Sequence, residues 1–258
     1  MSEVKVDTIS ERTAANGVAV DGVTIKDSGL TIPSGGTLTV ASGGTIDASA
    51  GTATGFAGGL ASVQTFTSSG TWTRPAGITK VIMEVQGAGG SGSGSPNGED
   101  CNGGGAGGYA KKLLDVSSIS TSTITVGAGG AGVDGGAGAV INAGNIGGAS
   151  SWADGTNTVT GNGGTGGVLT HYTGTEGATA TGGDINIRGG DAEGITGTAG
   201  VGGFSVLGSA GQGKTYTRNT SGWPPRGYGA GSGSACNWVG TYTSDTGGAG
   251  IVIVWEYK

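Results

Sequence analysis

The run Lys80-Val81-Ile82-Met83-Glu84-Val85-Gln86-Gly87-Ala88-Gly89-Gly90 decides the fold, because it joins a β-strand directly to a glycine tract. The first seven residues are mostly apolar and partly β-branched, which predicts a strand. Further strands are predicted at Val63–Thr67, Gly70–Thr73, Tyr109–Val116, Thr123–Val126 and Ile251–Tyr257, the last of them central to a sheet because it is the most apolar. Glycine tracts lie between them, at 103–108, 127–138, 161–167 and 227–231. This alternation predicts an all-β chain.

The glycine content limits how such a chain can be stable. Of 258 residues, 63 are glycine, and ordering glycine costs more conformational entropy than ordering any other residue. The tracts are either floppy loops or extended left-handed threefold helices packed side by side. Their near absence of charge favours the packed form, and only five prolines occur in the chain, which excludes collagen. Dense backbone packing, subunit association or both must offset the entropy.

The N-terminal residues have a different pattern. Short alternating strands are expected up to Lys26, followed by a repeat of period eight in Leu30–Thr37 and Leu38–Thr45, with a degraded copy in Ile46–Thr52. Each repeat has two apolar side chains, so three short rungs cannot bury a core within one chain. We therefore expect a homotrimeric β-stalk and attachment segment at residues 1–61, and a C-terminal domain at residues 62–258.

Charge and hydropathy exclude several classes of protein. The formal net charge is −6, so nothing predicts nucleic-acid binding. The longest apolar run, Ile251–Trp255, is too short to cross a bilayer, and no membrane insertion is expected. Residues Met1–Asp7 lack the apolar centre of a signal peptide, which predicts synthesis in the cytoplasm without one.

The chemical motifs are weak. Gly208–Thr215 fits a phosphate-binding loop, but Tyr216–Pro225 cannot form the helix that this loop requires. His171 is the only histidine, and it has no nucleophile motif beside it. One histidine and two cysteines are too few for a zinc site within the chain. We expect no enzyme activity, no cofactor and no metal.

Two groups of residues are better candidates for a functional or stabilising role. Cys101 and Cys236 each precede an asparagine among glycines, and they form either a disulfide or two independent thiols. Seven aromatic residues lie outside the clearest strands, where they suit sugar faces and protein hot spots, although several could instead fill the interior. The seven candidate receptor-binding residues are Trp152, Tyr172, Tyr216, Trp223, Tyr228, Trp238 and Tyr242.

A family resemblance gives these patterns a context. Phe66–Gly90 resembles the opening of the glycine-rich domain at the C-termini of bacteriophage tail fibres, and the pattern continues at Gly103–Ala110, Ile124–Gly130 and Gly247–Val254. The segment Asp7–Thr13 also resembles phage fibre proteins. The resemblance covers about residues 62–258, but the stretch 170–240 is richer in aromatic and polar residues than is usual in the family. Proteins of this kind are typically homotrimers that attach to the virion at one end and contact the host at the other.

The sequence thus predicts a virion fibre protein of the tail or capsid. A trimeric stalk would bind other virion proteins, and a glycine-rich, β-sandwich-like domain with packed polyglycine segments would carry loops for a host glycan or outer-membrane protein. Three weak sites acting together would supply the affinity. The alternatives are a purely structural decoration fibre, a non-phage polyglycine protein that binds ice or another surface, and a hydrolase whose carboxylate pair or triad the sequence does not reveal.

Overall fold

The structure is a computed structural model, and it describes residues 59–95, 101–135, 141–169, 174–195, 199–213, 224–236 and 242–258. The chain divides into two compact units, Met1–Phe56 and Ala57–Lys258. All described residues belong to the second unit. The predicted stalk repeats at residues 30–52 lie outside the described residues.

The described residues form two five-stranded antiparallel sheets and several two-stranded pairings, which confirms the all-β prediction. The first sheet has the order β1 (Leu60–Phe66), β18 (Ile251–Tyr257), β3 (Lys80–Gln86), β6 (Tyr109–Asp115) and β12 (Ile185–Ile187). The second has the order β11 (Ala180–Thr181), β10 (Thr158–Gly161), β9 (Ser150–Ala153), β7 (Thr121–Thr125) and β2 (Gly70–Thr73). In the part of the chain that the structure describes, no helix is long and apolar enough to cross a membrane.

The core lies between these two sheets. Strand β3 alternates, so that Val81, Met83 and Val85 are fully buried while the residues between them face outward. Trp72 from β2 and Trp152 from β9 fill the space opposite them, with ring centroids 6.3 Å apart. Strand β18 pairs on both sides, with β1 and β3, so the C-terminal strand lies inside the sheet as its apolar sequence predicts.

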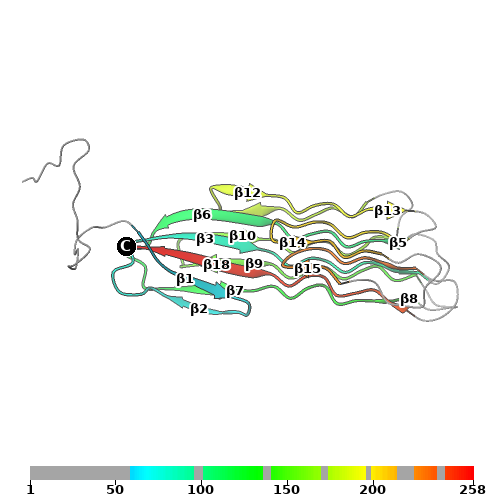
Figure 1. The fold of residues 1–258 in the computed structure, drawn as a ribbon, viewed down its shortest axis with the longest axis horizontal. Coiled ribbons are helices and arrows are strands. Elements are labelled where there is room, and N and C mark those ends of the chain that lie inside the picture. The colour runs from blue at the N-terminus through cyan, green and yellow to red at the C-terminus, as the bar shows by residue number, and fades with distance from the viewer. Residues whose placement is uncertain are drawn as a thin grey trace, which may run out of the picture. The chain divides into compact units, whose positions relative to one another are not determined.

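Glycine-rich segments run on from the sheets, side by side, towards the other end of this unit (Figure 1). Their hydrogen bonds repeat every third residue, which is the period of a polyproline II helix and differs from the period of two in a β-strand. One set joins residues 87–93 to 103–108, through Gly87 N to Gly108 O (2.9 Å), Gly90 N to Gly105 O (3.0 Å) and Ser93 N to Asn102 O (3.0 Å). A second set, one residue later, joins them to 142–148, through Ala88 N to Gly148 O (3.0 Å), Ser91 N to Asn145 O (2.9 Å) and Gly94 N to Asn142 O (2.9 Å).

We call these packed segments the glycine bundle; they comprise residues 87–93, 103–108, 127–133, 142–148, 162–167, 174–179, 189–193, 199–203, 210–213, 228–234 and 244–250. Close approach explains why they are glycine-rich. A Cβ atom on Gly107 would lie 2.1 Å from the carbonyl oxygen of Gly87, and one on Gly90 would lie 2.1 Å from that of Thr165. No side chain fits there, so the packed interpretation of the glycine tracts holds for these segments.

Candidate functional site: the distal end of the glycine bundle

Six of the two-residue strands lie at the end of the bundle away from the two sheets, which we call the distal end (Figure 1). They pair as β4 (Gly94–Ser95) with β16 (Ala235–Cys236), β5 (Cys101–Asn102) with β13 (Gly194–Ile195), and β8 (Asp134–Gly135) with β17 (Tyr242–Thr243). In sequence these strands flank the connections 96–100, 136–140, 196–198 and 237–241. The described residues that flank these four connections therefore lie at one end of the bundle.

Side chains fix these strands to one another. Asp134 is the centre of one group: Thr243 Oγ1 donates to its Oδ1 (2.6 Å), and Asn142 Nδ2 donates to its backbone oxygen (2.6 Å). Beside it, Val133 N donates to Ser244 Oγ (2.9 Å). These bonds tie together the residues on either side of connection 136–140 and link them to the residues that follow connection 237–241.

A disulfide adds a covalent link at the same end. Cys101 of β5 and Cys236 of β16 are bonded in the structure, with their Cα atoms 6.0 Å apart and a separation of 135 positions in sequence. Cys101 is fully buried. Of the two possibilities for the cysteines, a disulfide or two independent thiols, the structure has the disulfide. This bond joins the residue after connection 96–100 to the residue before connection 237–241.

The connection at 170–173 starts from the same region. Asn102 of β5 donates from Nδ2 to the carbonyl oxygen of Val168 (2.9 Å), and Val168 N contacts Thr175 Oγ1 (3.3 Å) on the returning segment. Thr175 itself forms a bridge with Ala192. The residues that flank five connections are thus held in one network.

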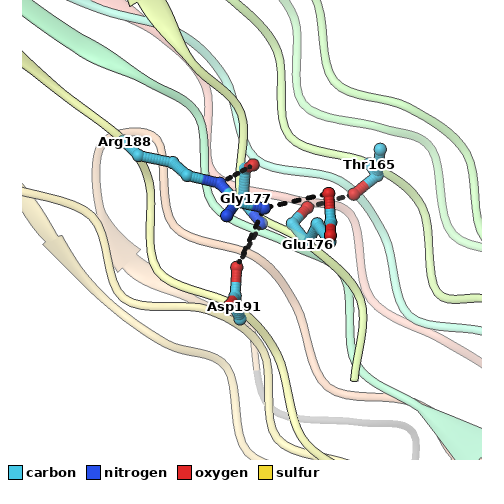
Figure 2. A network of polar contacts seen from close by, with 5 residues as sticks. All are labelled: Thr165, Glu176, Gly177, Arg188 and Asp191. Carbon is cyan, nitrogen blue, oxygen red and sulfur yellow. Dashed lines mark hydrogen bonds and ion pairs between the residues drawn. The ribbon is translucent and has the colours of Figure 1, made fainter. Parts of the chain in front are cut away.

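A charged network lies on the bundle between Arg188, Glu176 and Asp191 (Figure 2). The Arg188 Nη2 atom is 3.0 Å from Glu176 and 3.5 Å from Asp191, and its Nε donates to the carbonyl oxygen of Gly177 (3.0 Å). Asp191 Oδ1 also accepts from Gly177 N (2.8 Å). Both carboxylates are engaged by one guanidinium, so this arrangement clamps two bundle segments together and is not a free acid–base pair. Among the described residues, no group of three or more His, Cys, Asp or Glu side chains could hold a metal ion.

The glycine-rich domain family model matches residues 62–257. The chain belongs to this family. No curated protein matches the sequence.

The predicted recognition residues have different positions in this glycine-rich domain. Tyr172, Tyr216, Trp223 and Trp238 lie in connections outside the described residues. Tyr242 opens β17 at the distal end, where its backbone pairs with Gly135. Tyr228 is half-buried in the bundle, and its N–H donates to the carbonyl oxygen of Leu207 (3.0 Å).

Trp152 requires a correction. Its side chain is fully buried in the core between the sheets, so it cannot belong to an exposed recognition surface. The physical reason is the alternation of β9, in which Ser150 and Trp152 face inward. The other interpretation of the aromatic residues, that several fill the interior, applies to Trp152.

Sequence reasoning missed a shallow cavity on the side of the bundle. It has a volume of about 360 Å³ and is lined by Val201, Phe204, Ser209, Ala210, Gln212, Pro224 and Arg226. Phe204 is 63% exposed, which is high for a phenylalanine. The segment Phe204–Leu207 does not form the strand that a phosphate-binding loop at Gly208–Thr215 would need. Instead, Ser205 bridges to Gly208, and β14 (Gly208–Ser209) pairs with β15 (Arg226–Gly227).

Proposed function

We propose that this protein is a virion fibre protein whose glycine-rich domain presents its distal connections to the host surface. The recognised group would be a cell-surface glycan or an outer-membrane protein. Residues 1–61 would attach a homotrimer to other virion proteins, and binding would use several copies at once. The function is adhesion and requires no reaction.

The convergence of five connections at one end of the bundle carries this proposal. Within the bundle, glycines such as Gly107 and Gly90 have a neighbouring backbone in the place of a side chain, so substitutions there are excluded by packing. The connections include Tyr172 and Trp238. A rigid scaffold with variable loops at one end is the usual arrangement of binding proteins. The resemblance to phage fibres supplies the biological setting.

Adsorption of virions that carry the chain tests the proposal. Virions with Tyr172→Ser and Trp238→Ser are expected to adsorb to their propagating host about tenfold more slowly or worse, since aromatic hot spots dominate such interfaces. Virions with Ile146→Ser are the matched control, because Ile146 is 69% exposed on the bundle and belongs to none of these connections. If the double variant assembles into particles that adsorb normally, the distal connections are not the receptor-binding surface and the protein is a structural fibre.

A further inference from the structure

The first sheet has one face that no described segment covers. Its strands bury one set of side chains in the core, and the alternate set faces away from the second sheet. On β6, Ala110 is fully buried, whereas Leu113 is 56% exposed. On the edge strand β12, Ile185 and Ile187 are 52% and 42% exposed. We call this surface the outer face.

The outer face is apolar across the width of the sheet. The register places Val63, Trp255, Ile82 and Leu113 in one continuous row over strands β1, β18, β3 and β6. The neighbouring row contains the charged pair Glu84 and Lys111 and ends on Ile185, which pairs with Lys111. Val63 is 42% exposed although it lies in the middle of its strand. A contiguous apolar patch of this kind marks an interaction site on a soluble protein.

The charges on the outer face suit a second copy of the chain as the partner. It carries two cations and two anions: Lys80, Lys111, Glu84 and Asp115. They occupy facing positions on β3 and β6, Lys80 opposite Asp115 and Glu84 opposite Lys111, and the second pair is bonded at 3.1 Å. A face that is neutral and internally paired can be buried against an identical face without like-charge repulsion or an unpaired charge. The chain as a whole has a net charge of −6, so its copies repel each other as whole molecules, and a neutral face adds nothing to this repulsion.

We propose that the outer face of the first sheet packs against a second copy of this chain. Covering an open sheet face with another sheet is a standard way to complete a β-layer. The residues in contact would include Val63, Ile82, Leu113, Ile185 and Trp255. The inference deepens the proposed function, on which it rests for the presence of several copies. In a homotrimer the three outer faces would meet about the threefold axis, each against its neighbours.

Thiol labelling of the full-length protein tests this contact. Leu113→Cys places a thiol on the outer face, and Ile146→Cys places one on the bundle at a similar exposure, 69% against 56%. The two native cysteines are bonded to each other. In an associated sample, a maleimide is expected to react at position 113 at least about tenfold more slowly than at position 146, because a thiol under an interface reacts only when the interface opens. The difference should disappear on dilution to the monomer, as measured by light scattering.

Three results would overturn the proposal: a monomer at every concentration, equal labelling of the two positions in an oligomer, or protection of position 113 that persists in the monomer. The last result would show that a segment of the same chain covers the face. The double variant Leu113→Lys, Ile185→Lys provides a second measurement, since it should weaken association while leaving the unfolding temperature of the monomer nearly unchanged. Host adsorption is measured separately. If the thiol at position 113 is protected in the oligomer but virions with Tyr172→Ser and Trp238→Ser adsorb normally, host recognition through the distal connections is refuted and the contact between copies stands.

Discussion

The indole N–H of Trp72 donates a 2.7 Å hydrogen bond to Oε1 of Glu256, although 184 residues separate them in sequence. Glu256 is fully buried on the inner side of β18. The same carboxylate accepts from Gln64 Nε2 (2.7 Å) and from Ser62 Oγ, both on β1. One buried acceptor therefore holds the edge strand β1 and the second-sheet strand β2 to the C-terminal strand.

Substitution of Glu256 should separate the role of its charge from that of its hydrogen bonds. In Glu256→Gln, the amide oxygen can accept from Trp72 and Gln64 while the NH₂ group donates to Ser62, so the free energy of unfolding should change by about 1 kcal/mol or less. Glu256→Leu leaves the buried indole N–H of Trp72 without an acceptor and also removes the acceptor of Ser62 and Gln64, so it should cost about 2 kcal/mol or more. Urea unfolding of both variants measures the difference. Equal stability of the two would show that the three bonds are not needed.

Alanine substitutions of two glycines test the backbone packing. In Gly107→Ala, the new Cβ would lie 2.1 Å from the Gly87 carbonyl oxygen, so the bundle must shift, at a cost of about 3 kcal/mol or more. Gly70 on β2 has no atom within 4 Å of such a Cβ, and Gly70→Ala should be neutral or stabilise by about 0.5 kcal/mol through the unfolded state. Thermal unfolding gives both values. A Gly107→Ala protein as stable as the Gly70→Ala control would contradict close packing.

The turn between β9 and β10 predicts a pH dependence. Burial acts to raise the pKa of Asp154, but hydrogen bonds from Asn157 and Thr156 outweigh it and hold that pKa below its usual value of 3.8. Their backbone N–H groups donate to Oδ1 at 2.6 and 2.7 Å, around Gly155 with a φ of +93°.

A carboxyl whose pKa is lowered by folding stabilises the protein above its unfolded pKa, and this stabilisation is lost as the pH falls through the folded value. Asp154→Ala should therefore cost about 1 kcal/mol at neutral pH, a figure reduced for the partial exposure of the turn. The gap between variant and parent should narrow below about pH 4. Unfolding curves of the parent and Asp154→Ala at neutral pH and below about pH 4 measure the difference in unfolding free energy. A difference that stays constant with pH would show that the charge of Asp154 does not contribute to stability.

Local patterns sufficed to predict much of this fold. The alternation in residues 80–86 and the apolar run 251–257 predicted strands that the structure has at the same bounds, because apolar periodicity depends on neighbours in sequence. The buried position of Trp152 was not predicted, since it depends on which face of β9 meets Trp72. The distal end was also not predictable, because it arises from pairings such as Asp134 with Thr243, 109 residues apart. The one indication in the sequence was that Cys101 and Cys236 each precede an asparagine among glycines, which suggested that these two segments meet.

The disulfide predicts a local effect of reduction at the distal end. Opening the Cys101–Cys236 bond removes the covalent link between β5 and β16, so we expect stability to be lost mainly at the distal end. Amide exchange should speed up at Gly200, whose N–H donates to Cys101 O (2.9 Å), and at Ala235, whose N–H donates to Ser93 O (3.0 Å). Exchange at Met83 and Val254 in the first sheet should change little, because these residues belong to the core at the other end.

Hydrogen-exchange mass spectrometry of the oxidised protein and the Cys101→Ser, Cys236→Ser variant measures both regions. Uniform acceleration in both regions would show that the bond stabilises the whole domain, and no acceleration would show that the backbone bonds hold the distal end without it.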